Sequence, residues 1–392
     1  MNALDVVLLA CALVYALTGY QQGFLVGSFS TIGLALGGLI GIQVVPWLLD
    51  GFSPGVSVSV AALLIVVLLS FVGQGLGAVG GQRLRRHVTW RPARLVDAIS
   101  GAALSVAAML VMAWVLGVAA TGAQLDGINK EVQESTVLGA VDKAMPGASE
   151  RLLNAFDAVV SSTDFPRYLE PFESERIVPV PAPNRGIVRE AGVRQAGRSV
   201  VKIVGDARSC SETLEGSGFV YAPHRVMTNA HVVAGVEHPI VRLSDTDHAA
   251  TVVYYNSDID VAVLSVPDLS APVLHFGGPA QSGREAAVLG YPEDGPYDVE
   301  PARVRSEQHL TSPDIYGNGT VNRDTYAVYS RVRPGNSGGP LVSAQGRVLG
   351  VVFAASLIDD STGYALTADQ VSQAARAGLR LSRSVSTGGC AL

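Results

Sequence analysis

One serine in the chain has the neighbours that acyl-transfer chemistry requires. Ser337 lies within residues 335–340, which read GNSGGP, so the glycines around it leave its hydroxyl group unobstructed. Glycine also adopts positive φ readily, which can turn backbone N–H groups toward a single point. The amides of Gly335 and Ser337 are therefore candidates for an oxyanion hole beside a nucleophilic Oγ. Taken alone, the same run is equally well explained as a tight turn without chemistry.

A base and an acid upstream favour the chemical interpretation. A serine hydroxyl needs a base to take its proton, and that base needs a third group to orient it. His231 ends the run 228–231, TNAH, and Asp260 begins the apolar run 260–264, DVAVL. Asp258, two residues earlier, is the competing candidate for the acid. The order His, Asp, Ser is the one that chymotrypsin-like proteases use, whereas subtilisins and α/β-hydrolases use other orders.

Four short motifs in this order resemble those of the HtrA-type, trypsin-like serine proteases, over roughly residues 195–380. The motifs are residues 216–219 (GSGF), 228–231, 260–263 and 335–340. The resemblance implies two antiparallel β-barrels with the catalytic groups in the cleft between them. It also implies that Ser337 attacks the scissile carbonyl, that His231 carries the proton and that Asp260 orients the histidine. Asp260 is preferred to Asp258 because the family pattern places the acid directly before the apolar run.

The sequence from residue 200 onward is typical of an all-β domain. Short β-type runs are separated there by Gly, Pro, Asn and Asp, and many short strands with few helices predict a barrel or a sandwich. A final helix is expected over residues 368–379. Strands are expected near residues 200–204, 218–221, 225–227, 249–255, 261–266, 286–289, 327–332 and 348–353.

The N-terminal third has the composition of a membrane domain. The 392-residue chain has 16% charged and 48% hydrophobic residues, whereas soluble domains have about 25% charged residues. Residues 1–82 contain no lysine or arginine. Most of the four apolar runs in the N-terminal third meet the length of ~20 residues that a membrane-spanning helix needs. We therefore predict a four-span transmembrane domain over residues 1–120, with helices near residues 4–19, 24–49, 56–79 and 95–120.

The basic residues between the third and fourth runs predict the orientation of these helices. Loops rich in Lys and Arg stay cytoplasmic, so the fourth helix leaves the cytoplasm, and the amino terminus and everything after residue 120 lie outside. A secretory signal peptide is the alternative for the first run, but that run lacks a basic n-region. The prediction is a multi-pass protein of the cytoplasmic membrane with an extracytoplasmic, periplasmic protease domain. The basic residues are Arg83, Arg85, Arg86, Arg91 and Arg94.

The membrane domain also resembles a known family. Gly33, Gly37 and Gly41 share one helix face, which allows close approach of a second helix, although glycine is common in membrane helices in any case. The region as a whole resembles the four-helix domain of colicin V production proteins. Such a domain before an HtrA-type protease resembles the membrane-anchored acid-resistance serine proteases of mycobacteria and their actinobacterial relatives (the MarP type). A role in acid or oxidative stress follows from this resemblance alone.

A connector over residues 121–190 separates the membrane domain from a protease domain over residues 191–392. Residues 129–145 and 152–160 have helical periodicity. The prolines that follow favour an extended tether. A tether beside a protease is a candidate for self-cleavage, and an uncut spacer is the alternative. The prolines are residues 166, 171, 179, 181 and 183.

The resemblance implies a specificity pocket lined by Arg331, six residues before Ser337, and by the later strand that contains Ala354 and Ala355. No aspartate occupies the expected base of this pocket. Cleavage after Lys or Arg therefore has no electrostatic basis, and we expect an apolar or small side chain there. The alternatives are that Arg331 attracts an acidic side chain or points to solvent.

Three cysteines are present. Cys11 lies in the first membrane run and is interpreted as a packing residue. Cys210 and Cys390 are the two outside the membrane, where an oxidising compartment favours a disulfide between them. The bridge would contribute about 5 kcal/mol in the chain-entropy model, and it is a candidate for redox regulation. Two free thiols are the alternative.

Other function classes find little support. No His-Glu-x-x-His motif or Cys/His cluster is present, so we expect no metal and no other cofactor. The net charge of −6 argues against nucleic-acid binding. The expected partners are the lipid bilayer and protein substrates. The leading hypothesis is a membrane-anchored extracytoplasmic serine endopeptidase that acts on cell-envelope proteins. The alternative is a membrane scaffold or binding protein with a latent or inactive protease-like domain.

Overall fold

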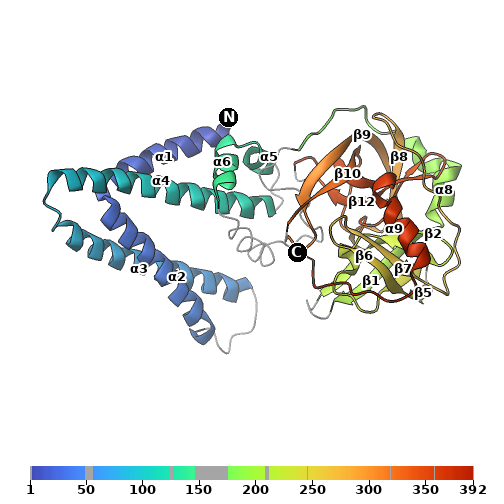
Figure 1. Cartoon of the computed structure of the whole chain (residues 1–392), viewed down its shortest axis with the longest axis horizontal. Helices are drawn as coiled ribbons and strands as arrows, with labels where there is room; N and C mark the ends of the chain where they lie inside the picture. The colour runs from blue at the N-terminus through green and yellow to red at the C-terminus, as the bar shows by residue number, and fades with distance from the viewer. Residues whose placement is uncertain are drawn as a thin grey trace. The chain divides into compact units, whose positions relative to one another are not determined.

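The computed structural model describes residues 2–48, 56–122, 128–145, 175–207, 212–244, 246–317, 319–356 and 358–391. The chain forms two compact units, an N-terminal helical unit and a C-terminal β-rich unit (Figure 1).

Four long helices make up the helical unit, and each contains a stretch long enough and apolar enough to cross a membrane. Large apolar side chains such as Leu13, Leu68 and Phe71 are exposed on them, as expected where lipid replaces water. The four helices predicted from the sequence are therefore confirmed. They are α1 (Ala3–Gln22), α2 (Phe24–Leu48), α3 (Val56–Arg85) and α4 (Arg91–Gly122).

Helices α2 and α3 pack backbone against backbone through glycines. A Cβ added at Gly33 would lie 2.1 Å from the carbonyl oxygen of Gly73, and one at Gly37 would lie 2.2 Å from that of Leu69. A Cβ at Gly41 would lie 2.9 Å from the Cα of Val66. The glycine face predicted on the second helix is thus the contact face, because any side chain there would push the helices apart.

One end of the helical unit is held by a buried carboxylate. Asp97 of α4 accepts a hydrogen bond from the amide of Leu25 at 2.9 Å and pairs with Arg85 Nε at 2.8 Å. Arg85 also donates to the carbonyl oxygen of Gln21. These contacts gather the α1–α2 turn, the end of α3 and the start of α4 at the same end of the unit, beside the arginine-rich loop.

A second buried carboxylate joins the start of α1 to helix α6 (Thr136–Ala144). Asp5 accepts hydrogen bonds from Ser135 Oγ at 2.6 Å and from the amides of Thr136 and Val137 at 3.2 and 3.1 Å. It therefore caps the amino-terminal end of α6, whose first N–H groups have no partner inside the helix. The amino-terminal end of α1 and residue 135 consequently lie at one end of the unit.

The first sheet of the β-rich unit has seven antiparallel strands in the order β5-β4-β1-β2-β3-β7-β6. Its edge strands β5 and β6 are consecutive in the chain, so the sheet curls. Alternate residues such as Ile203, Val226 and Leu264 are buried and form its core. The strands are β1 (Val200–Ala207), β2 (Glu212–Ala222), β3 (Arg225–Thr228), β4 (Ile240–Leu243), β5 (Thr246–Ala249), β6 (Thr251–Asn256) and β7 (Val261–Ser265).

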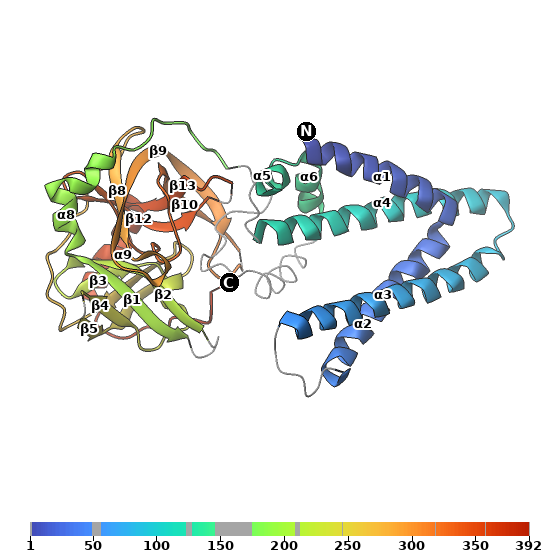
Figure 2. The ribbon, with the colours of Figure 1, turned by 180° about the vertical axis from the view of Figure 1, so that it is seen from behind.

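The second sheet closes into a six-stranded barrel in the order β10-β13-β12-β11-β8-β9. Val288, Leu341 and Val352 lie in its core. Figure 2 shows the barrel in orange and red and the first sheet in colours from green to yellow. The chymotrypsin-like fold predicted for this region is confirmed. The strands are β8 (Glu285–Gly290), β9 (Asp298–Pro313), β10 (Thr320–Tyr329), β11 (Pro340–Ser343), β12 (Val348–Ala355) and β13 (Thr362–Thr367).

Short helices cover the β-rich unit. Helix α9 (Ala368–Arg380) follows Thr367, whose side chain caps the helix by accepting from the amide of Gln370 at 3.1 Å. Its buried face packs on strands of both sheets, and the Tyr221 hydroxyl donates to the carbonyl oxygen of Ala375 at 3.1 Å. The remaining elements are α5 (Ile128–Gln133), η1 (Arg185–Arg189), α8 (Ala191–Gly197), η2 (His231–Val233) and η3 (Pro292–Asp294).

The last part of the predicted connector, residues 175–190, contacts the barrel. Ile187 of η1 is buried in the main hydrophobic core, and the amide of Asn184 donates to Glu285 Oε2 of β8 at 3.0 Å. Residues 175–190 therefore pack with the β-rich unit. The predicted helix over 129–145 forms as the two short helices α5 and α6. The helix expected over 152–160 lies outside the described residues.

Candidate active site

His231 is held by a carboxylate at the edge of the neighbouring strand. Strands β3 and β7 pair with Thr228 opposite Ala262, so the segment after β3 lies beside the residue before β7. Asp260 Oδ1 accepts from the backbone amide of His231 at 2.9 Å, and Oδ2 lies 2.9 Å from His231 Nδ1. Asp260 is fully buried, whereas Asp258 is exposed. The structure thus brings Asp260 to the histidine.

The backbone of Asp260 is in an unusual conformation. Its φ is 57°, in the left-handed region that costs energy for a residue with a side chain. The carbonyl oxygen of Asp260 accepts a hydrogen bond from Asn229 Nδ2 at 2.8 Å. Together with the two contacts to His231, this bond offsets the backbone strain and fixes the carboxylate.

Ser337 follows a tight loop between β10 and β11, and both sheets hold that loop. Its carbonyl oxygen accepts from the amide of Ser217 in β2 at 2.8 Å, and the amide of Gly338 donates to Val352 in β12 at 2.8 Å. A Cβ at Gly338, where φ is +82°, would lie 2.2 Å from Thr228 Oγ1. The loop that carries Ser337 therefore abuts the segment that leads to His231.

The Ser337 side chain is itself buried. Its Oγ has no hydrogen-bond partner among the described residues, although buried hydroxyl groups in proteins are normally bonded. The Ser337 hydroxyl therefore makes no hydrogen bond to His231 Nε2 in this structure.

The loop before Ser337 is oriented by a short turn that the sequence did not point to. The amide of Glu293 donates to the carbonyl oxygen of Pro334 at 2.8 Å. Because the C=O and N–H of one trans peptide point in opposite directions, this bond turns the Gly335 N–H away from Glu293. Gly335 has φ +86°. Among the described residues, the amides of Gly335 and Ser337 donate to no backbone carbonyl.

Ser217 supports the same loop through its side chain. Its Oγ donates to the carbonyl oxygen of Gly335 at 2.6 Å and accepts from the amide of Tyr291 at 2.9 Å. Ser217 belongs to the GSGF motif, but the motif alone gave no role to its hydroxyl. A serine between two glycines was the available signal.

Arg333 anchors the loop to the barrel through acidic side chains. Its guanidinium pairs with Asp298, with Glu300 at 3.0 Å and with Glu293 at 4.0 Å. Burial and the neighbouring charge of Asp298 raise the pKa of Glu300, and the charge of Arg333 opposes this shift only in part. No sequence pattern connects these residues, because they come from separate segments that the barrel brings together.

The residues expected in the specificity pocket lie on adjoining segments. Ala354 and Ala355 are in β12, opposite Tyr364 and Gly363 of β13. Arg331 is exposed and lines a cavity of about 850 Å³. The next residue, Val332, is buried instead, with its Cγ2 2.2 Å from where a Cβ of Gly363 would be.

The C-terminal tail runs beside the histidine segment. Thr387 accepts at its carbonyl oxygen from the amide of Gly235 at 3.2 Å and donates through Oγ1 to Val236 at 3.1 Å. Cys390 follows in this tail. Cys210 lies outside the described residues, so the disulfide stays a prediction. Within the described ranges, no three His, Cys, Asp or Glu side chains are grouped to hold a metal ion.

A curled sheet and a closed barrel that hold a histidine, an aspartate and a serine in this order define a chymotrypsin-like serine protease. The family model of the trypsin-like peptidase domain matches residues 216–351, and that of the colicin V production protein matches residues 4–146. The serine protease Rv3671c of Mycobacterium tuberculosis is 38% identical over 391 residues, which cover 99% of this chain and 98% of that protein.

Two further comparisons agree. A crystal structure of the Rv3671c protease from M. tuberculosis, in its active form, matches with a TM-score of 0.55 and 44% identity, and it covers 58% of this chain and 100% of that chain. A probable periplasmic DegP-like serine endoprotease of Halomonas elongata is 34% identical over 145 residues, 35% of this chain and 28% of that protein. The chain belongs to the membrane-anchored, HtrA-type serine proteases with an N-terminal colicin V production domain.

Proposed function

We propose that this serine protease cleaves cell-envelope proteins outside the cytoplasmic membrane, with Ser337, His231 and Asp260 as its catalytic triad. The observation that carries the triad is the double contact of the Asp260 carboxylate with the His231 amide and Nδ1, both at 2.9 Å. With Nδ1 bound to the carboxylate, Nε2 is the atom that takes the serine proton.

The proposed triad hydrolyses a peptide bond in two stages. Ser337 Oγ attacks the scissile carbonyl carbon while His231 accepts the hydroxyl proton and then delivers it to the leaving amine. The amides of Gly335 and Ser337 stabilise the oxyanion that develops. Water then attacks the acyl-enzyme, with His231 again as the base. Asp260 remains ionised and stabilises the imidazolium form.

The fluorophosphonate reaction tests this assignment in the full chain. In membranes that contain the wild-type protein, a fluorophosphonate probe should label the chain, and Ser337→Ala should abolish the label. Absence of labelling in folded wild-type protein would overturn the assignment and would favour a scaffold or binding role for the protease-like domain.

The extracytoplasmic location of the protease domain is supported by the helical unit. The Arg85–Asp97 pair marks the end that carries the basic loop, and the Asp5 cap of α6 marks the opposite end. Since arginine-rich loops stay in the cytoplasm, the residues that lead to the protease lie outside. A cysteine introduced at exposed Glu237 should react with a membrane-impermeant maleimide in intact cells. Reaction only after lysis would contradict this orientation.

Two finer roles complete the proposal. Resemblance to acid-resistance proteases supports action in acid or oxidative stress, and the position of residues 121–190 before the protease domain supports self-cleavage within them. Mass spectrometry of membrane fractions should find a wild-type fragment that Ser337→Ala lacks. Intact chain alone in the wild type would remove the self-cleavage proposal.

A further inference from the structure

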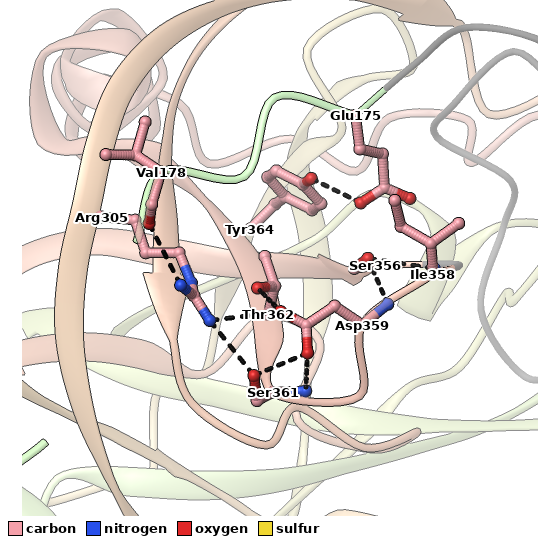
Figure 3. Close-up of polar contacts among 9 residues, drawn as sticks. All are labelled: Glu175, Val178, Arg305, Ser356, Ile358, Asp359, Ser361, Thr362 and Tyr364. Atoms are coloured by element: carbon pink, nitrogen blue, oxygen red, sulfur yellow. Dashed lines mark hydrogen bonds and ion pairs between the residues drawn. The ribbon is translucent and has the colours of Figure 1, made fainter. Parts of the chain in front are cut away.

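Arg305 of β9 is a buried arginine that contacts three separate segments, and Figure 3 shows its contacts with two of them, the connector and the β12–β13 turn. It is 5% exposed. Its NH1 group donates to the carbonyl oxygen of Val178 at 3.1 Å, and NH2 donates to Asp359 Oδ2 at 3.2 Å and to Ser361 Oγ at 3.1 Å. The guanidinium carbon also lies 4.4 Å from the centre of the Tyr329 ring. One side chain thus contacts the connector, the β12–β13 turn and the end of β10.

The β12–β13 turn is built around Asp359. The carboxylate of Asp359 accepts from the amide of Ser361 at 3.0 Å and from Thr362 Oγ1 at 2.7 Å. Ser356 Oγ accepts from the amide of Asp359 at 3.0 Å. Burial acts to raise the pKa of Asp359, but these hydrogen bonds and the charge of Arg305 lower it below its ordinary value. The carboxylate is therefore ionised and available to Arg305 at neutral pH.

The two segments that Arg305 supports flank the predicted specificity pocket. The β12–β13 turn directly follows Ala354 and Ala355, and Tyr329 precedes Arg331 on the path to Ser337. The amide of Ser330 donates to the carbonyl oxygen of Ser361 at 2.9 Å, which joins the two segments to each other. Arg305 itself touches no reacting atom, so any effect on catalysis must pass through these segments.

The third segment comes from the connector. Besides the Val178 carbonyl on Arg305, the carboxylate of Glu175 accepts a hydrogen bond from the Tyr364 hydroxyl at 2.8 Å. Tyr364 lies in β13 and is 1% exposed. Burial and the negative charge of Glu175 raise the pKa of Tyr364, so its hydroxyl stays protonated and donates. Residues 175–178 therefore contact the residues beside the predicted pocket at two points, the side chains of Arg305 and Tyr364.

A guanidinium suits this role better than other side chains. Burying a charge is costly unless it is paired and hydrogen-bonded, so an apolar residue would fill the space at lower cost. A guanidinium instead has five donors in a rigid plane. It can bind a backbone carbonyl, a carboxylate and a hydroxyl at once and fix their relative positions.

We propose that Arg305 is a positioning residue for the specificity pocket, and that residues 175–178 of the connector activate the protease in cis by completing its contacts. Docking of this segment holds the β12–β13 turn and the segment from Tyr329 in the arrangement that binds substrate. The inference rests on the proposed catalytic site. It makes the chain that leads from the membrane helices part of the substrate-binding machinery.

The test compares two reactions of the full chain in detergent micelles. A small alkyl fluorophosphonate reports Ser337 reactivity, and fluorescein-labelled casein reports substrate binding and cleavage through kcat and KM. In Arg305→Gln, kcat/KM for casein should fall at least about tenfold, mainly through KM, because small displacements in a binding site are costly. Labelling should fall by less than about threefold, and Arg305→Lys should recover part of the loss.

The hydrogen bond between Tyr364 and Glu175 of the connector is tested separately. This second test also decides the proposal if Arg305→Gln does not fold. Glu175→Gln and Tyr364→Phe should each lower kcat/KM, and the double variant should lose no more than the larger single effect, because both remove the same bond. Arg242→Gln is the matched control, since Arg242 forms an exposed ion pair with Asp247 on the other sheet.

Four outcomes would overturn the inference. They are kcat/KM values within about twofold of wild type in folded Arg305→Gln, equal losses of labelling and casein cleavage, additive effects of Glu175→Gln and Tyr364→Phe, and an equal loss in Arg242→Gln. A wild-type protein that the probe does not label would instead contradict the proposed catalytic site. The two failures are therefore distinguishable.

Discussion

Asp260 holds His231 at two points, since one carboxylate oxygen accepts the backbone amide and the other lies on Nδ1, both at 2.9 Å. The first contact positions the main chain, and the second sets the ring orientation and the tautomer. Both depend on the left-handed backbone of Asp260, at φ 57°. The structure therefore uses one strained residue to fix both the place and the chemistry of the histidine.

Replacement of Asp260 should abolish most of the activity without unfolding the domain. In Asp260→Asn the histidine would be held as the wrong tautomer, and kcat should fall by about 10⁴-fold, as in related triads. Asp258→Asn is the matched control, because Asp258 is exposed. Casein cleavage by the two purified full-length variants measures the difference. Equal activity of both variants would contradict the assignment of Asp260 as the acid.

Gly338 should tolerate no side chain. Its φ is +82°, and a Cβ would lie 2.2 Å from both Thr228 Oγ1 and the Ser217 carbonyl oxygen. Gly338→Ala should cost about 2 kcal/mol or more of stability through strain and overpacking, and it should slow fluorophosphonate labelling. Gly278→Ala provides the control, since nothing lies within 4 Å of its added Cβ. Equal denaturation midpoints for the two variants would refute the close approach of the two segments.

Glu300, which lies beside the loop before Ser337, should make the stability of the protease domain depend on pH. Its pKa is raised, chiefly by burial and then by Asp298, so folding favours its protonated form. Its contribution to the free energy of unfolding is full below about pH 4.3, the pKa of Glu in the unfolded chain. This contribution is lost as the pH rises through the raised pKa of Glu300 in the folded protein. Glu300→Gln should therefore melt higher than wild type at pH 7.

The same variant should melt at the wild-type temperature below about pH 4. There Glu300 is protonated in both states and resembles glutamine. Thermal unfolding followed by circular dichroism at several pH values measures this difference in melting temperature between Glu300→Gln and wild type. If the difference in melting temperature between Glu300→Gln and wild type does not become smaller at acid pH, Glu300 acts through its shape and not through its charge.

The fold could be predicted because its signals are local. Apolar runs of spanning length, an arginine-rich loop and short strands with turn residues each depend on neighbours in sequence. The catalytic candidates were also accessible, because His231, Asp260 and Ser337 each lie in a short run of distinctive composition. The spacing of Gly33, Gly37 and Gly41 allowed a contact face on α2, although glycine abundance in membrane helices was an equal explanation.

The support around the site could not be predicted in this way. Glu293 acts through its backbone amide, Ser217 through a hydroxyl inside a glycine motif, and Arg333 through carboxylates from two other segments. These roles depend on which segments the sheets bring together. Docking of residues 175–178 was missed for the same reason, because prolines in the connector indicate an extended chain but not where that chain binds.

Close packing of α2 and α3 should be needed for the stability of the helical unit but not for the chemistry of the protease. Gly33→Ala would place a Cβ 2.1 Å from the Gly73 carbonyl oxygen, whereas Gly75→Ala meets nothing within 4 Å. The first variant should therefore lose heat resistance in detergent and accumulate less in membranes, while the second should behave as wild type. Molecules of Gly33→Ala that remain folded should label with fluorophosphonate at the wild-type rate. Identical behaviour of the two variants in heat would show that the helices do not depend on this contact.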